Sequence, residues 1–381
     1  MLEIIDKSKC SGCHSCANIC PKNCISMEPD DEGFLYPKIA TEHCVSCALC
    51  EKSCPIISPK QIEKRQNDII AYATYTKNEE IRLNSSSGGV FTEIASYIIN
   101  NDGVVFGAAF DDDFSVSHKY VENIDELSIF RGSKYVQSAI KNTYKKAKEF
   151  LDNGRMVLFT GTPCQIGGLY SYLNKEYTNL ITQDFICHGV PSPSVWQKYL
   201  DYQRKKKRSE INNVSFRDKT SGWKRFSMLC DFENGDRYIR VLNKDPYMQS
   251  FLSNNCLRPS CYNCSFKGQE RKSDITIADF WGIQEIKPEM NDDKGVSLVF
   301  VSSAKGHKIF DAISKKLVIE TVNIDEAIKY NPSAIKSVKM PQKREVFMKS
   351  IKNKGFIKTT NRFFGGNFIL MLKKVARKIL K

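Results

Sequence analysis

No run of apolar residues in this 381-residue sequence approaches the ~18 that a membrane-spanning helix needs, and the amino terminus MLEIIDKSKC lacks the apolar core of a secretion signal. A G-x-G-x-x-G motif is also missing, which disfavours a Rossmann-type dinucleotide enzyme. With 41% hydrophobic residues, the composition is otherwise that of a globular protein. We therefore expect a cytoplasmic protein of two or three domains.

Acidic residues are scarce in one region. Residues 341–381 contain 12 Lys or Arg and one acidic residue, Glu345, so this tail carries +11 of the total net charge of +14. The remaining body is nearly neutral, and we expect no nucleic-acid partner. The basic run at 204–208 is expected to be a solvated helix end. The last part of the tail has apolar residues near helical spacing and suits a helix on an anionic membrane surface, on an acidic partner or on its own domain.

Cysteine, by contrast, is abundant, with 15 residues. Thiols stay reduced in the cytoplasm, and disulfide scaffolds belong mainly to short secreted proteins. The cysteines are therefore expected to bind metal.

The pattern C-x2-C-x2-C-x3-C-P occurs twice, at 10–21 and 44–55. In two-cluster ferredoxins the first three thiolates bind one [4Fe-4S] cluster and the fourth binds the other. We assign one cluster to Cys10, Cys13, Cys16 and Cys54, and the second to Cys44, Cys47, Cys50 and Cys20. A pair of zinc sites is the alternative, although zinc favours cysteine pairs separated by longer loops. The block of about 57 residues resembles the bacterial two-cluster ferredoxin module.

From about residue 69 onward, strand-like runs alternate with helical patterns, which predicts an α/β (α+β) core with a mixed or parallel sheet. Two strand-to-helix turns carry cysteines, Cys164 in GTPCQIGGL and Cys187 in DFICHGVPSPSVW. Cys164 is expected at a helix amino terminus, a position that lowers a thiol pKa. The run SSSGGVFT at 85–92 suits a phosphate or flavin loop, and equally an ordinary helix cap.

A further cysteine set, CLRPSCYNCSFK, has the spacing C-x4-C-x2-C, and no cysteine follows Cys264. We expect Cys256, Cys261 and Cys264 to bind a core cluster with an upstream fourth ligand, Cys187 or alternatively Cys164. A structural zinc remains the alternative for this set.

These motifs, with GSKYVQS, FRDKTSGW and DITIADFWG, resemble the coenzyme F-420 hydrogenase/dehydrogenase beta-subunit family, amino- and carboxy-terminal regions, behind a ferredoxin domain. The resemblance implies FAD and a core [4Fe-4S] cluster. The flavin residues it implies are Ser87, Gly88, Gly89, Lys134, Gly161, Thr162, Pro163, Gln165 and His188. The domains expected are 1–57 (ferredoxin), 58–68 (linker), 69–150 (flavin-binding amino-terminal region), 151–340 (carboxy-terminal region with the core cluster) and 341–381 (helical basic tail).

The function expected is that of an oxidoreductase passing electrons between [4Fe-4S] clusters and FAD, with hydride exchange to a deazaflavin or other small organic substrate. Lys134 is assigned to stabilising reduced flavin, with a surface ion pair as the alternative. His188 is assigned as a proton donor, with a structural histidine as the alternative. A non-catalytic electron-transfer subunit of a larger redox complex is the competing interpretation, so the partner is a redox protein or a small molecule.

Overall fold

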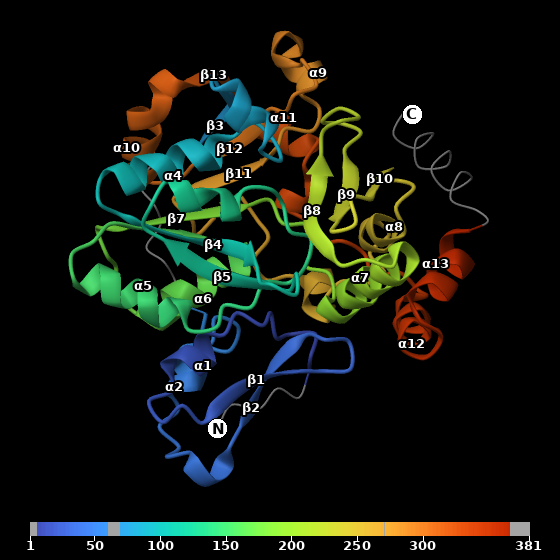
Figure 1. Cartoon of the computed structure of the whole chain (residues 1–381). Coiled ribbons are helices and arrows are strands. Elements are labelled where there is room, and N and C mark those ends of the chain that lie inside the picture. Colours follow the sequence, from blue (N-terminus) through green and yellow to red (C-terminus); the bar gives the residue numbers. More distant parts are fainter. Residues whose placement is uncertain (1–5, 60–68, 270, 366–381) are drawn as a thin grey trace.

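The computed structural model describes residues 6–59, 69–269 and 271–365. Residues 60–68 of the predicted linker and the tail beyond residue 365 lie outside this range. The described chain has a small amino-terminal domain, a large sheet covered by helices on both faces, and a three-stranded sheet with its own helices (Figure 1).

The amino-terminal domain combines an antiparallel hairpin with two short helices. Its elements are α1 (Ser15–Ile19), β1 (Ile25–Pro29), β2 (Leu35–Ile39) and α2 (Leu49–Lys52). The helices lie within the two cysteine runs, so the predicted ferredoxin-like domain is confirmed.

The large sheet has eight strands and mixed direction. Their order is β13 (Leu317–Val322), β3 (Ile70–Thr76), β12 (Ser297–Val301), β11 (Ile275–Asp279), β7 (Leu180–Phe185), β6 (Val157–Thr160), β4 (Val104–Phe110) and β5 (Val116–Val121). The central strands β11, β7, β6 and β4 are parallel, and the outer strands pair antiparallel. This confirms the α/β core with a mixed sheet.

Helices bury both faces of this sheet, because successive strand residues point to opposite sides. Phe106 and Phe159 belong to one apolar cluster, whereas their neighbours Val105 and Leu158 belong to another. The first face is covered by α5 (Thr143–Asp152) and α6 (Pro163–Leu173), and the second by α4 (Val90–Asn100) and α10 (Ala304–Ile313). Short helices α3 (Glu79–Leu83), α9 (Ile283–Ile286) and α11 (Ile324–Lys329) join the strands.

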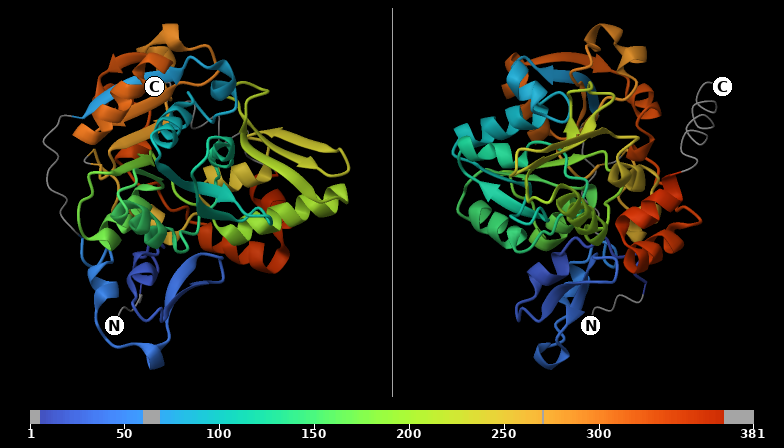
Figure 2. Two further views of the ribbon diagram at one scale, coloured as in Figure 1. Left: turned by 60° about the vertical axis from the view of Figure 1, so that its left-hand side comes forward. Right: turned by 45° about the vertical axis from the view of Figure 1, so that its right-hand side comes forward.

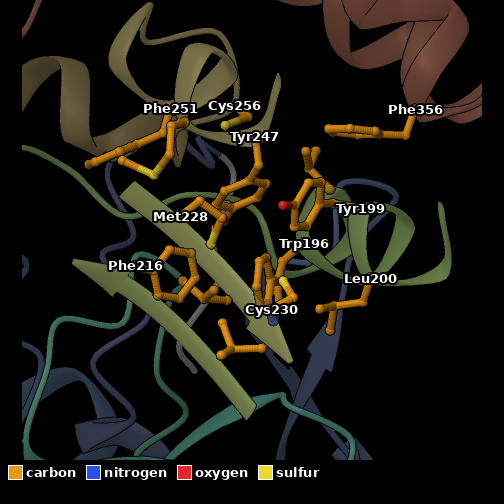
Figure 3. Close-up of a cluster of buried hydrophobic side chains, with 14 of the residues drawn as sticks. Trp196, Tyr199, Leu200, Phe216, Met228, Cys230, Tyr247, Phe251, Cys256 and Phe356 are labelled. Carbon is orange, nitrogen blue, oxygen red and sulfur yellow. The ribbon is translucent and has the colours of Figure 1, made fainter. Parts of the chain in front are cut away.

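The second sheet packs against four helices around an aromatic core. Its strands are β8 (Ile211–Asp218), β9 (Ser227–Phe232) and β10 (Arg237–Val241), and the helices are α7 (Pro193–Lys207), α8 (Pro246–Leu252), α12 (Arg344–Lys354) and α13 (Phe356–Phe364). Trp196, Tyr199 and Phe216 are fully buried here (Figure 3). Burying each such side chain stabilises the fold by about 1.5–3 kcal/mol.

Helix α7 includes four of the five residues of the basic run at 204–208 in its last turn and ends at Lys207. Positive charge at a helix carboxyl end interacts favourably with the helix dipole. The expectation of a basic helix end is confirmed. In the part of the chain that the structure describes, no helix has the length and apolar character to cross a membrane.

The ferredoxin-like domain is docked at one end of the core, beneath α5 and α6 (Figures 1 and 2). The Arg344 guanidinium from α12 donates to the Glu32 carboxylate, with Nη1 3.0 Å from Oε1. Asn18 in α1 donates to the Lys141 carbonyl at 2.8 Å. Phe34, in the turn between β1 and β2, is completely buried. These contacts fix the domain against the core through both its helix and its hairpin.

Candidate iron–sulfur and cofactor sites

The first ferredoxin set of cysteines comes together on the side of the domain that faces the core. Burial first, and then the nearby Cys10 and Cys54, raise the pKa of Cys13 to about 12. Burial also raises the pKa of the Cys16 thiol, and the neighbouring thiols of Cys13, Cys10 and Cys54 raise it further. Cys10, Cys13, Cys16 and Cys54 are therefore close enough to act on one another electrostatically.

Local backbone geometry explains how each C-x2-C run turns so tightly. Gly12 and His14 both have positive φ, 67° and 62°, and α1 begins directly afterwards. The second run repeats this pattern, with Ser46 at 53° and Ala48 at 57° before α2. His14 is buried beside Arg258, and burial first, and then Arg258, lowers its pKa to about 3, so the ring is neutral at pH 7.

The second ferredoxin set lines a hollow of the amino-terminal domain. Cys20, Cys44, Cys47 and Cys50 line one hollow of about 400 Å³, which includes space open to solvent. Cys47 is exposed. A fifth cysteine, Cys24, also lines this hollow, with its Sγ 3.4 Å from that of Cys20.

Four other cysteines meet in the core, although they come from three separate segments. Cys164 lies in the first turn of α6, Cys187 follows β7, and Cys261 and Cys264 belong to the 3-10 helix η3 (Pro259–Asn263) and its end. Burial raises the pKa of Cys164, and the neighbouring Cys264, Cys187 and Cys261 raise it further. Because β6 and β7 are adjacent parallel strands, the turns after them meet at one sheet edge.

This arrangement differs from the predicted ligand set in one residue. Both candidate upstream ligands, Cys164 and Cys187, join Cys261 and Cys264, whereas Cys256 lies apart. Cys256 is completely buried beside Tyr247 and Phe251 (Figure 3), and its charged neighbours are Arg344 and Glu32. The spacing C-x4-C-x2-C suggested a ligand triplet, but the chain turns between Cys256 and Cys261 and separates them.

Helix α6 connects the core cysteines to the first ferredoxin set. Cys164 and Gly168 are four residues apart, so they share a helix face and are separated by about 6 Å along the axis. A Cβ atom on Gly168 would lie 2.9 Å from the Cys13 Sγ. One helix turn thus separates the two groups of thiols.

The thiol groups suit a polynuclear cluster as donors. In the described ranges 6–59, 69–269 and 271–365, no three His, Cys, Asp or Glu side chains surround the position of a single metal ion. Zinc would need its ligands at about 2.3 Å from one centre. The four thiolates of a [4Fe-4S] cluster each bind a different iron, so they lie farther apart.

The loop before α4 is packed against the sheet. The Ser87 hydroxyl donates to the Val296 carbonyl at 2.8 Å, and the Gly88 amide donates to the Ser297 hydroxyl at 3.0 Å. A Cβ on Gly88 would lie 2.5 Å from the Thr74 carbonyl oxygen, and Gly89 has φ +82°. Both glycines are therefore required by the close approach of this loop to β3 and β12.

Lys134 and His188 both have defined partners. The Lys134 ammonium donates to the Ile129 carbonyl at 2.8 Å and the Arg131 carbonyl at 3.0 Å, and burial lowers its pKa to about 7. The His188 Nε2 donates to the Asn254 side-chain oxygen at 2.6 Å, and burial lowers the pKa of His188. The surface ion pair considered for Lys134 is absent from the contacts described.

The turn at 161–165 forms a helix cap. Thr162 and Gln165 make a reciprocal capping box, Pro163 is the first helical residue, and the Thr162 hydroxyl lies 3.0 Å from the Cys164 sulfur. Gln165 also donates to the Ser138 carbonyl at 3.1 Å. A Cβ on Gly161 would lie 3.1 Å from the Gln165 oxygen. This turn fixes the start of α6, and with it Cys164.

A group of charged residues beside the Ser85–Gly89 loop was not identified individually from the sequence. The Arg217 guanidinium donates to both Asp279 oxygens, at 2.6 and 3.0 Å, and to the Ser86 carbonyl at 3.2 Å. Lys219 donates to the Ser87 carbonyl at 3.0 Å, and its pKa is lowered to about 7 by burial and then by Arg217. The FRDKTSGW and DFWG motifs contain these residues, but only the fold pairs them.

This loop region also has polar groups without partners. The Nε atoms of Arg131 and Arg217 are buried and make no hydrogen bond within the described chain. A Cβ on Gly132 would meet no atom within 4 Å, so the backbone is open at this point. Cationic donors beside open backbone fit an anionic cofactor such as one carrying a pyrophosphate.

Three segments of the chain match known families. Residues 71–144 match the family described as the amino-terminal region of the coenzyme F420 hydrogenase/dehydrogenase beta subunit. Residues 154–327 match the family described as the carboxy terminus of the same beta subunit. Residues 9–56 match a 4Fe-4S dicluster domain.

Individual proteins are similar over parts or most of the chain. The uncharacterized protein MJ1349 of Methanocaldococcus jannaschii is 23% identical over 358 residues, which cover 85% of this chain and 92% of that protein. The uncharacterized ferredoxin MJ0722 of the same organism is 31% identical over 71 residues, 17% of this chain and 91% of that protein. A chain of the F420-reducing [NiFe] hydrogenase complex from Methanosarcina barkeri is 16% identical, with a TM-score of 0.47, over 72% of this chain and 93% of that chain.

Proposed function

Because the chain belongs to the coenzyme F420 hydrogenase/dehydrogenase beta-subunit family and carries a 4Fe-4S dicluster domain, we propose that it is an iron–sulfur flavoprotein. In this proposal it holds three [4Fe-4S] clusters and FAD, and it exchanges a hydride with a deazaflavin or another small organic substrate. The cluster ligands proposed for the ferredoxin domain are the two sets described above. The core ligands proposed are Cys164, Cys187, Cys261 and Cys264.

The convergence of these four core thiols is the observation that carries the proposal. The four thiols meet at one sheet edge and have no disulfide among them, and Cys264 is close enough to raise the pKa of the other three, beyond the larger effect of burial. Binding iron would offset this mutual repulsion, since a metal ligand is a deprotonated thiolate whose charge the metal balances. Gly168 and α6 hold this group one helix turn from Cys13, a distance suited to electron transfer between two sites.

The chain's own residues would bind and orient the cofactors. When bound, clusters transfer single electrons, and FAD exchanges single electrons with them and a hydride with an organic partner. Arg217 and Lys219, fixed against the Ser85–Gly89 loop, would bind the anionic part of FAD together with the free Nε of Arg131. With a pKa near 7, Lys134 would gain or lose its positive charge at neutral pH.

His188 would accept a proton beside the core thiols, rather than donate one as assigned from the sequence. Its Nε2–H is fixed by the Asn254 oxygen, which leaves Nδ1 as the free acceptor. The lowered pKa keeps the ring neutral at pH 7, so Nδ1 is available to accept a proton.

The test is the cofactor content of the anaerobically purified chain. We expect about twelve iron, about twelve sulfide and about one FAD per chain, with no zinc. About eight iron, stoichiometric zinc and no flavin would contradict the flavoprotein proposal and leave a ferredoxin domain on a zinc-stabilised core.

A second candidate function is an electron-transfer subunit without its own organic substrate. The feature that favours it is the outer surface of the ferredoxin domain. There Cys47 is exposed, and Val45 and Leu49, which line the hollow of the second cysteine set, are 57% and 38% exposed. Such an apolar surface beside a cluster suits a redox partner protein. Turnover of a reduced dye by the isolated chain favours the flavoenzyme, and a requirement for a stable partner subunit favours the relay.

A further inference from the structure

Arg258 lies between the first ferredoxin cysteine set and the core cysteine set. It is completely buried, three residues before Cys261. Its Nε donates to the Cys10 carbonyl at 2.8 Å, and its Nη2 lies 3.7 Å from the Cys10 sulfur, within the range of a weak N–H···S hydrogen bond. Its backbone carbonyl accepts a hydrogen bond from the Cys261 amide at 2.9 Å. Arg258 therefore contacts Cys10 of the first ferredoxin set through its side chain and Cys261 of the core set through its backbone.

The remaining donors and faces of Arg258 are also fixed. Nη1 donates to the Gln137 side-chain oxygen at 2.9 Å, and Nη2 donates to the Leu35 carbonyl at 3.0 Å. The guanidinium lies 4.2 Å from the centre of the Tyr36 ring. A Cβ on Gly12 would lie 2.8 Å from Nη1, so the first C-x2-C run packs directly on this charge.

Arg258 differs from every other buried arginine of the described chain in lacking a carboxylate. The other four each pair with one: Arg82 with Asp292, Arg217 with Asp279, Arg271 with Asp184, and Arg344 with Glu32. Arg258 has neutral oxygens, an aromatic ring and a cysteine as its neighbours. A buried charge without a counter-charge is costly, so this environment requires a negative group that the side chains alone do not supply.

We infer that Arg258 is the counter-cation of the cluster bound by Cys10, Cys13, Cys16 and Cys54 and raises its reduction potential. An oxidised [4Fe-4S] cluster with four thiolates carries a charge of −2, and reduction adds one more negative charge. A fixed cation and an N–H···S hydrogen bond both favour the more negative, reduced state. Arg258 is therefore a positioning residue that acts through Cys10. The inference rests on the proposed clusters.

The test is an anaerobic redox titration, followed by EPR, of the full-length holoprotein and four variants. Arg258→Met removes the charge, and Arg258→Lys retains it. Gln137→Glu places a carboxylate against Nη1 with nearly unchanged shape, so it neutralises the charge without removing the arginine. Arg344→Met is the matched control, because Arg344 also joins the ferredoxin domain to the core but contacts no proposed ligand.

We expect Arg258→Met and Gln137→Glu to lower the reduction potential of one of the two ferredoxin-domain clusters by about 59 mV. For a one-electron couple this is about a tenfold change in the equilibrium constant of reduction. The other ferredoxin-domain potential should stay unchanged, and Arg258→Lys should remain close to wild type. Unchanged potentials in Gln137→Glu and Arg258→Met would overturn the inference. An equal shift in Arg344→Met would also overturn it, since domain docking would then be the cause.

Two outcomes separate this inference from the proposed function. If Arg258→Met loses iron, the other two variants still test whether Arg258 raises the potential. Gln137→Glu keeps the arginine, and Arg258→Lys keeps the positive charge. If the wild-type chain binds no iron, the proposed clusters fail, whereas bound clusters with potentials that do not depend on Arg258 leave the proposed function intact.

Discussion

The ferredoxin domain and the core collect their cysteines in different ways. In the ferredoxin domain, two local runs with left-handed turns bring each set together within about 50 residues of chain. In the core, Cys164, Cys187 and Cys261 come from segments that meet only because β6 and β7 are parallel neighbours and η3 folds back on them. The first kind of site depends on short-range turns, and the second depends on the whole fold.

The largest expected effect tests which cysteines belong to the core site. Cys164→Ser should reduce the iron content by about four atoms per chain and leave the ferredoxin-domain iron in place. Cys256→Ser is the matched control. Cys256 belongs to the same C-x4-C-x2-C run as Cys261 and Cys264, but it lies in the apolar cluster of Figure 3. Iron analysis of both purified variants decides whether Cys164 or Cys256 is a ligand of the core site. Loss of iron in Cys256→Ser with full iron in Cys164→Ser would restore the ligand set predicted from the spacing.

An intermediate effect is expected where the two kinds of site touch. Gly168→Ala adds a methyl group 2.9 Å from the Cys13 sulfur and 2.9 Å from the Tyr144 hydroxyl, so α6 and the ferredoxin domain must move apart. Overpacking of this kind costs about 1–3 kcal/mol in the free energy of unfolding. The EPR signal of the ferredoxin-domain clusters should also change, because the Cys13 environment is altered.

The control for this change is a glycine with similar crowding but no cysteine nearby. A Cβ on Gly306 in α10 would lie 2.5 Å from the Asp274 carbonyl oxygen. Gly306→Ala should lower stability by a similar amount and leave the EPR signal unchanged. Identical spectra in both variants would show that Gly168 does not influence the first cluster.

The smallest effect concerns the core alone. Burial lowers the pKa of Lys134 from 10.5 to about 7, so between these values the unfolded chain holds a proton that the folded chain lacks. Wild-type stability should therefore rise with pH across this window, by about 1 kcal/mol per pH unit, and should stop changing below pH 7. Lys134→Met should reduce this slope in guanidinium unfolding at pH 7.5, 8.5 and 9.5, and Lys219, whose pKa is also lowered to about 7, accounts for a slope that remains.

A surface lysine provides the comparison for that experiment. Lys141 is 56% exposed and pairs with Asp111. Lys141→Met should leave the pH slope of the unfolding free energy as it is in wild type. The assignment of a buried ammonium at Lys134 is refuted if both variants keep the wild-type slope.

The same contrast explains how much was predictable from the sequence. The alternating strand and helix patterns predicted the mixed α/β core, and the repeated cysteine motif predicted the ferredoxin-like domain, because both signals are local. The position of Cys256 was not predictable, since its distance from Cys261 along the chain says nothing about the turn between them. The pairing of Arg217 with Asp279 was also hidden, because 62 residues separate the two in sequence.

The docked position of the ferredoxin domain has a kinetic consequence. Its attachment through Glu32 and Asn18, and through the chain itself, makes any exchange between its clusters and the core an intramolecular event. The rate of such an exchange would not depend on protein concentration, whereas the proposed delivery of electrons by a separate partner at the exposed Cys47 would. Dilution should therefore slow only the entry of electrons into the chain and leave their passage within it unchanged.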